Sequence, residues 1–407
     1  MSGERRDWPA LDVLRGIAVL CMLMNHASVR LLDEHDLSAG VAASLSFAGS
    51  FAPVLFFLAT GVGYGLAHRP GAAGDARGVW VKAGILIVAD AFLRSGEFPS
   101  IGWDFLGFIA LSMLILQALR GRRHGVMVAV ALIAALVLVR YGLGPYYREG
   151  VDPDAPSHWM APLLGIRRFP GAAYWFAPWL VYPLVGFVVG VTLSRYRAFY
   201  RGRVLPICVA MLATAAAIGA VSHVLKLQGL PLFRWGTMSL NFFIASFACV
   251  AAALALAGLV GDRWRNASAI RALSLRGVSS LAVVPIHYLL LGLSQLAMPP
   301  PISQASYLMF LLPFGAACFY LACQVENLSR IVPVSRTATC VMVAIVAVSA
   351  LVCGLSTQEA SRFLAAHLAQ LILAVLVGLA YSGRRASAFA LPDRMDVPSA
   401  ASLGRLR

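Results

Sequence analysis

The sequence predicts an all-α membrane protein, a polytopic bundle of about 11–12 spanning helices. Hydrophobic residues make up 60% of the 407 residues and charged residues only 13%, about half the charge of a typical soluble protein. Apolar runs of about 20 residues recur along the chain, which is the length that crosses a bilayer as a helix. These runs are continuous rather than alternating, which excludes a transmembrane β-barrel.

The predicted spans follow the apolar runs in order. They cover residues 11–30, 42–67, 79–93, 103–119, 125–140, 174–193, 204–223, 238–260, 272–295, 304–322, 338–355 and 363–381. The segment 79–93 is short and contains Lys82 and Asp90, so eleven spans is the alternative to twelve. We expect one membrane domain over 1–383 and a disordered cytoplasmic tail over 384–407, because the tail contains Ser, Pro and Arg without periodicity.

Charge indicates the orientation in the membrane. With the N-terminus in the cytoplasm, 23 of the 33 Lys and Arg residues lie in cytoplasmic segments, nine lie on the opposite side, and Arg15 lies inside the first span. By the positive-inside rule, both termini are predicted to be cytoplasmic. The same rule explains the net charge of +15, so lipids rather than nucleic acid are the expected partners of this basic chain.

The first span carries a polar face. Successive helical residues turn by about 100°, which places Asp12, Arg15 and His26 within roughly 60° of one another, whereas Asn25 is expected to point elsewhere. Asp or Arg at mid-bilayer costs about 2.5–3.5 kcal/mol, so this face should look into protein or a wet cavity. His26 should lie about 21 Å from Asp12 along the helix axis.

Three segments resemble integral membrane acyltransferases. LDVLRGIAVLCMLMNH at 11–26 resembles the opening signature of the heparan-α-glucosaminide N-acetyltransferase-like family and of the acyltransferase-3 family. FAPVLFFLATGVGYG at 51–65 resembles their second helix, and LRGVSSLAVVPIHYLL at 275–290 resembles the late helix that ends in Ile-His. The arginine-rich motif of acyltransferase-3 proteins is missing before the third span, which favours the heparan-type branch, whereas His26 is closer to the acyltransferase-3 pattern.

The resemblance implies an acyltransferase of a bacterial inner membrane. It implies that an acyl group, commonly acetyl, moves from acyl-CoA to a hydroxyl or amine of a glycan or another cell-envelope acceptor. Acyl-CoA would be a co-substrate, with no tightly bound cofactor. Such a transfer needs a base and hydrogen-bond donors for the developing oxyanion. His26 suits the role of general base, since histidine titrates near neutral pH, or that of a transient acyl carrier.

Other polar residues in the spans are further candidates. Arg15, with Asp12, is a candidate for binding the donor; the alternative is an ion pair at i,i+3 that only stabilises the helix. His287 follows Pro285, and a proline kink could turn the histidine into a cavity; the alternative is a hydrogen bond to a freed carbonyl.

Asp104 and Asn241 are weighed as ligands for substrate or donor. Asp104 could instead be an acidic charge favoured at a helix N-terminus, and Asn241 an amide that bridges two helices. The loop 141–173 carries aromatic and charged side chains that could contact a sugar or sit at the headgroup level. Thr60-Gly61, Gly63 and Gly65 form a small face that is expected to allow close helix packing, with a substrate channel as the alternative.

The remaining patterns exclude several chemistries and leave one rival. The eight histidines and seven cysteines show no metal-ligand spacing, and neither a phosphate-binding glycine loop nor a Gly-x-Ser-x-Gly elbow occurs. The rival function is a secondary transporter, for which twelve spans is a common number. The loop after the second span partly matches a transporter motif, but Val79 and Trp80 stand where a basic pair is expected.

Overall fold

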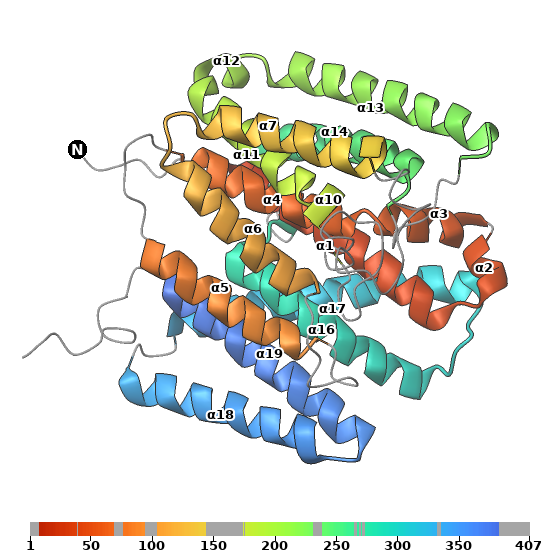
Figure 1. Ribbon diagram of the computed structural model, residues 1–407. Helices are drawn as coiled ribbons and strands as arrows, with labels where there is room; N and C mark the ends of the chain where they lie inside the picture. The colour runs from red at the N-terminus through yellow and green to blue at the C-terminus, as the bar shows by residue number, and fades with distance from the viewer. Residues whose placement is uncertain are drawn as a thin grey trace, which may run out of the picture.

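The protein is a bundle of α-helices (Figure 1). The computed structural model describes residues 8–38, 40–68, 76–93, 104–143, 174, 176–230, 238–263, 267, 270, 273–331 and 335–381. Much of the loop 141–173 and the tail 384–407 therefore lie outside the described residues. Within the described ranges, every predicted span coincides with helix, which confirms the all-α class.

Ten helical segments in the described part of the chain are long and apolar enough to cross a membrane. They are α1 (Pro9–Leu31), α3 with α4 (Gly40–Gly49 and Ala52–Leu66), α7 with the π-helical turn η1 (Gly125–Val137 and Leu138–Leu143), α10 with α11 (Phe176–Trp179 and Val181–Arg195), α13 (Val204–Leu227), α14 (Leu240–Arg263), α16 (Gly277–Ala297), α17 (Gln304–Ile331), α18 (Arg336–Leu355) and α19 (Glu359–Tyr381).

Two predicted spans are shorter helices. They are α5 (Ala76–Ala91) and α6 (Phe105–Arg120), each of 16 residues. The buried Asp90 explains the polar interruption in α5, because its carboxylate accepts hydrogen bonds from the backbone N–H groups of Asp104 at 2.6 Å and Leu106 at 2.9 Å. These are N–H groups that the start of a helix leaves without an intrahelical partner, so Asp90 fastens the beginning of α6 to the end of α5.

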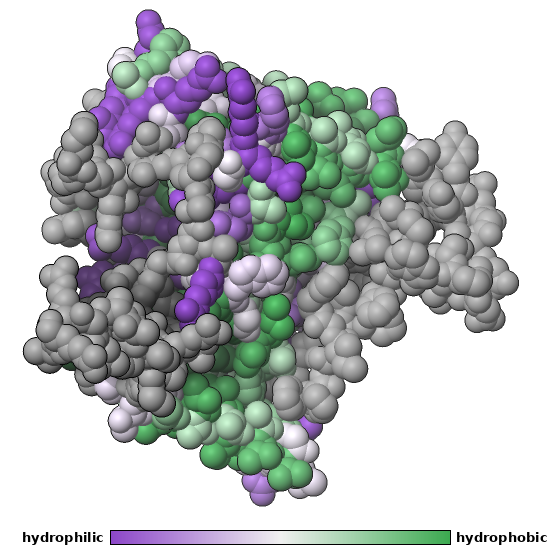
Figure 2. All heavy atoms as spheres, turned by 60° about the vertical axis from the view of Figure 1, so that its left-hand side comes forward, coloured by the Kyte–Doolittle hydropathy of each residue, from purple (hydrophilic) through white to green (hydrophobic). Residues whose placement is uncertain are grey.

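The helices surround α1, which packs against α3, α4, α14, α16 and α17. Figure 1 shows α13 at one edge of the bundle and α18 at the other. Only Cys208 and Ser222 of the 24 residues of α13 are buried, so this helix presents an apolar surface outward. Figure 2 shows broad hydrophobic areas on one face of the molecule beside a hydrophilic region, as expected for a protein in contact with lipid.

Glycines set the closest helix contact. A Cβ at Gly61 or Gly65 of α4, or at Gly186 or Gly190 of α11, would lie only 2.0–2.4 Å from a backbone carbonyl oxygen of the facing helix. The two backbones therefore touch directly, as small residues permit between membrane helices. This confirms the packing predicted for Gly61 and Gly65, whereas Gly63 faces α1.

Close contacts also hold α1 in place. A Cβ at Gly16 would lie 1.9 Å from the carbonyl oxygen of Leu273, and the N–H of Leu275 donates to the Asp12 carbonyl at 3.1 Å. Near its other end, the hydroxyl of Tyr307 in α17 donates to the Met24 carbonyl at 2.9 Å. Tethers near both ends fix the rotation of α1 and hence the direction of its polar face.

Candidate functional site

A cavity of about 590 Å³ lies beside the C-terminal half of α1. Segments far apart in the sequence enclose it: α1, the junction of α3 and α4, the end of α5, the start of α6, Tyr174 and the middle of α16. The polar and aromatic residues of its lining include Asn25, His26, Arg30, Phe56, Asp104, Phe105, Tyr174, His287 and Tyr288. We call this the histidine cavity.

Two histidines meet in its wall. The Nδ1 atom of His26 lies 2.7 Å from the Nε2 atom of His287, and the ring centroids are 4.9 Å apart. His287 is fully buried, and its Nδ1 lies 3.0 Å from the carbonyl oxygen of Val283, one turn earlier in α16. Both sequence-based alternatives for His287 therefore hold: the ring bonds to a carbonyl of its own helix and also faces the cavity.

This hydrogen-bond chain determines where the protons lie. The Val283 carbonyl can only accept a hydrogen bond, so Nδ1 of His287 carries a proton. In the neutral ring, Nε2 of His287 is then the acceptor, and it receives the hydrogen of His26 Nδ1. A neutral His26 that donates from Nδ1 has its lone pair on Nε2. The chain therefore prepares His26 Nε2 as a base or nucleophile.

Tyr288 is a cavity residue that the sequence reasoning missed. Its ring stacks on His26 with centroids 5.3 Å apart and lies 4.1 Å from the ring of His287. The ring of His367 in α19 packs edge-on against it at 5.6 Å. The only signal in the sequence is its position directly after His287. Helical periodicity alone gives no reason to place Tyr288 in the same site, because adjacent residues of a helix point about 100° apart.

Other residues of the cavity lining combine charge and aromatic rings. Arg30 belongs to the last turn of α1 and Asp104 precedes α6, where its carboxylate accepts the Phe105 N–H at 2.8 Å. Asp104 therefore caps the N-terminus of α6, which was the structural alternative for this residue, and it also lines the cavity. Burial raises the pKa of Tyr174 well above its usual value, and the nearby Asp104 carboxylate acts in the same direction. Tyr174 therefore stays a neutral hydroxyl.

Asn25 departs from the sequence-based prediction. It lines the histidine cavity, although it was expected to point away from His26. Its Nδ2 donates to the Ser46 carbonyl in α3 at 3.1 Å. The reason is that α3 packs on this side of α1, so the cavity wraps around a wider arc of α1 than one narrow stripe.

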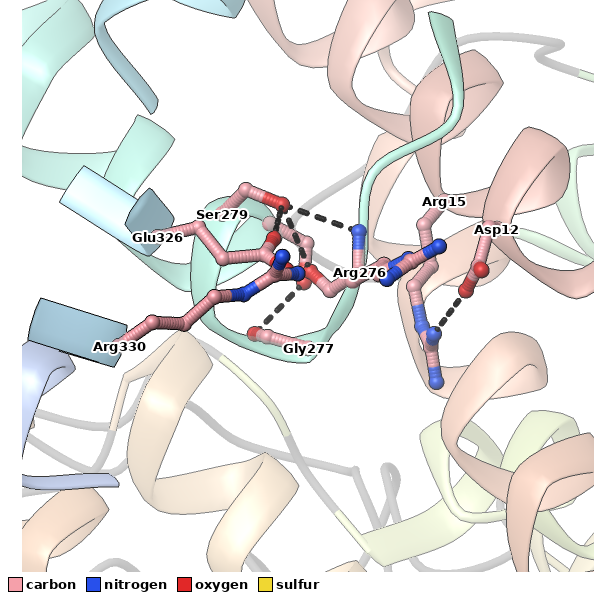
Figure 3. Close-up of polar contacts among 8 residues, drawn as sticks. Asp12, Arg15, Arg276, Gly277, Ser279, Glu326 and Arg330 are labelled. Carbon is pink, nitrogen blue, oxygen red and sulfur yellow. Dashed lines mark hydrogen bonds and ion pairs between the residues drawn. The ribbon is translucent and has the colours of Figure 1, made fainter. Parts of the chain in front are cut away.

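The other part of the polar face lies near the opposite end of α1. Arg15 and Asp12 form an ion pair at 2.6 Å (Figure 3). Arg276, at the N-terminal end of α16, lies between this pair and a second pair, Glu326 with Arg330 at 2.5 Å. Ser279 joins the groups, since its hydroxyl donates to Glu326 at 2.7 Å. We call Asp12, Arg15, Arg276, Glu326 and Arg330 the arginine cluster.

Asn241 is placed away from both regions. Its amide oxygen accepts from the Ser222 hydroxyl at 2.6 Å, and its Nδ2 donates to the Leu230 carbonyl at 3.2 Å. It does not belong to the lining of the histidine cavity. These contacts join α13 to α14, which is the helix-bridging alternative for this residue. In the described ranges, no group of three or more His, Cys, Asp or Glu side chains could hold a metal ion.

Comparison with known protein families identifies a match over the N-terminal half of the chain. The family model described as heparan-alpha-glucosaminide N-acetyltransferase, catalytic, matches residues 6–224, just over half of the chain. The matched region contains Asp12, Arg15, His26 and Asp104 and ends before Asn241 and His287. No curated protein and no solved structure matches the chain.

Proposed function

Because the chain belongs to the heparan-α-glucosaminide N-acetyltransferase family, whose members are membrane enzymes that use acetyl-CoA, we propose that the histidine cavity is where the acetyl group is transferred. The acceptor would be an amine, or a hydroxyl, of a glycan or another cell-envelope molecule. The observation that carries this proposal is the 2.7 Å contact between His26 and His287 in the cavity wall. The family match also weighs against the transporter alternative.

In the proposed step, His26 Nε2 takes a proton from the acceptor nitrogen as that nitrogen attacks the thioester carbonyl. The new C–N bond forms, the C–S bond breaks, and the proton passes from His26 to the departing thiolate, which leaves as CoA-SH. Catalysis by a positioned base of this kind contributes about 10²–10⁴-fold. The alternative is that Nε2 itself attacks and carries the acetyl group to the acceptor.

His287 acts on His26 in either route. His287 Nε2 holds the His26 imidazole in place by accepting the hydrogen bond from His26 Nδ1. Because His287 Nδ1 donates to the Val283 carbonyl, the neutral His287 ring can present only an acceptor to His26. When His26 gains a proton, this acceptor stabilises the imidazolium. His26 is then a base that a second side chain, His287, holds in the correct orientation and tautomer.

The arginine cluster is the proposed docking point for the phosphates of acetyl-CoA. Arg15 lies eleven residues before His26, about 16 Å along the axis of α1, a separation suited to the long pantetheine arm of CoA. Arg276 adds a second positive charge beside the Asp12–Arg15 pair. Guanidinium groups suit phosphate because they bind two oxygens at once. With the N-terminus in the cytoplasm, this end of the bundle would face cytoplasmic acetyl-CoA, in the inner membrane of a bacterium.

The charged and aromatic part of the cavity lining is the proposed acceptor site. Arg30 and Asp104 offer one charge of each sign, and Tyr174 offers an aromatic face with a neutral hydroxyl. A carboxylate and an aromatic ring are suited to an amino sugar, because the carboxylate can accept a hydrogen bond from the neutral amine and the ring can pack on the apolar face of the sugar. Asn241, with its amide engaged between α13 and α14, is assigned a structural role rather than a place in this site.

The test uses purified protein in sealed vesicles with radiolabelled acetyl-CoA on the cytoplasmic side. Wild type should retain label or pass it to an added glycan extract, and His26→Ala should do neither. His223→Ala is the matched control, because His223 is an exposed histidine of the peripheral α13. Near-normal turnover by His26→Ala would overturn the assignment. Absence of label transfer and CoA release in wild type with several acyl donors would make solute uptake the next assay.

A further inference from the structure

The proposed transfer leaves one chemical need unassigned. When the acceptor attacks the thioester, negative charge develops on the carbonyl oxygen, and a positioned hydrogen-bond donor at that oxygen is commonly a large contribution to catalysis. The two histidines do not supply it, since His26 handles the proton and His287 is engaged with His26 and Val283. Another group in the cavity lining is therefore expected to supply the hydrogen bond.

Several polar neighbours are already engaged. Asn25 donates through Nδ2 to the Ser46 carbonyl, and the Ser50 hydroxyl donates to the Phe47 carbonyl at 2.6 Å. The hydroxyl of Tyr288, in contrast, forms no hydrogen bond with the described residues, although its ring lies in the cavity wall. A half-buried hydroxyl that faces a cavity without a protein partner is available to a ligand.

The Tyr288 side chain lies next to the base. Its ring stacks on the His26 ring, 5.3 Å away between centroids with a 30° tilt. Both residues line the same cavity, so a thioester carbonyl attacked beside His26 would also lie beside the Tyr288 side chain.

The ring is also held firmly. His287 packs on it at 4.1 Å, and His367 packs edge-on at 5.6 Å. His367 is itself fixed, because its Nδ1 lies 2.6 Å from the Phe363 carbonyl oxygen in the preceding turn of α19. A donor held by packing needs no reorganisation when charge develops, which is the property that makes oxyanion stabilisation effective.

We propose that Tyr288 is the oxyanion donor of the acetyl transfer, an inference that rests on the proposed function of the histidine cavity. Tyr288 donates its hydroxyl hydrogen to the thioester oxygen, which becomes negative as the C–N bond forms and returns to a carbonyl as the C–S bond breaks. Tyr288 keeps its proton throughout, while His26 alone transfers one.

The first test is Tyr288→Phe in the full-length purified protein, with acetyl-CoA as donor and glucosamine as the acceptor probe. Phenylalanine keeps the ring contacts and removes only the hydroxyl. We expect kcat to fall about 10²–10³-fold, as for loss of one oxyanion donor, with KM for acetyl-CoA within twofold of wild type. Tyr320→Phe, at a 64% exposed tyrosine of α17, is the control with unchanged kcat.

The second test needs no acceptor. Trifluoroacetonyl-CoA hydrates to a tetrahedral gem-diol, which becomes an oxyanion when one of its acidic hydroxyls loses a proton, and it therefore resembles the intermediate. We expect Tyr288→Phe to weaken its binding at least tenfold, while acetyl-CoA binding changes less than twofold. Equal affinities in wild type and Tyr288→Phe would overturn the inference even if His26→Ala is inactive. A wild type that binds neither CoA compound would instead remove the proposed function, and the inference with it.

Discussion

The two polar regions on α1 differ in burial and in charge. In the histidine cavity, His287 is fully buried, and two neutral imidazole rings satisfy the hydrogen bonds from His26 to His287 and from His287 to Val283. In the arginine cluster, the side chains of Arg15 and Asp12 are 23% and 30% exposed and form an ion pair. Helix α1 therefore contributes one member of a neutral pair inside the bundle and both members of a charged pair near its end.

The difference follows from the cost of burying charge. An ion removed from water must be paired and hydrogen-bonded, and even then the desolvation penalty is large, whereas a hydrogen-bonded neutral imidazole carries a much smaller one. Recognition of a charged donor is therefore easier at the exposed end of the helix, and proton transfer is more effective at the buried histidine pair. Acetyl-CoA, with phosphates far from its thioester, suits this separation.

The largest expected effect is at His26. Replacement by alanine removes the base, and kcat for acetyl transfer should fall by about 10³-fold, within the range for loss of a general base. Binding of acetyl-CoA, measured by titration calorimetry, should be unchanged because the proposed docking point of the phosphates is the arginine cluster. Loss of binding together with loss of turnover would contradict the proposal that the histidine cavity transfers the acetyl group while the arginine cluster binds the donor.

His287 should have the next largest effect. His287→Leu removes the acceptor for His26 Nδ1 and lets the imidazole turn or adopt the other tautomer, so kcat should fall about 10²-fold. His287→Gln restores an acceptor and should recover part of the activity. Stopped-flow measurement of CoA release would compare the variants; equal loss in both would assign His287 to packing instead.

Arg15 should affect donor binding rather than turnover. Arg15→Ala removes one phosphate contact and should raise KM for acetyl-CoA about tenfold with kcat little changed, since a contact made equally in ground and transition states affects KM alone. The wild-type KM should also rise with salt, because the cluster is partly exposed. A fall in kcat at saturating donor would contradict this role.

The smallest effect is expected at Glu326, and its sign is opposite. Glu326 adds negative charge to the arginine cluster next to Arg330 and Ser279. Glu326→Gln keeps the size and removes that charge, so binding of the anionic donor should tighten by about two- to threefold at low salt. Weaker binding in this variant would show that Glu326 is needed to position the arginines.

Features that depend on neighbours along the chain could be predicted from the sequence. The apolar runs determined the helical segments, the i,i+3 spacing determined the Asp12–Arg15 pair, and the small face of α4 determined close packing at Gly61. The short third span is also confirmed, since α5 has 16 residues; what the sequence did not show is that Asp90 joins α5 to α6 by accepting hydrogen bonds from backbone N–H groups at the start of α6.

What only the tertiary structure decided is which polar groups share a space. His26 and His287 are 261 positions apart, and only the packing of α16 on α1 brings Nδ1 and Nε2 to 2.7 Å. Asp104 and Asn241 are both polar interruptions in the sequence, yet Asp104 faces the cavity and Asn241 joins α13 to α14. Periodicity assigns a residue to a side of its own helix; the neighbour on that side is chosen by the packing of the whole bundle.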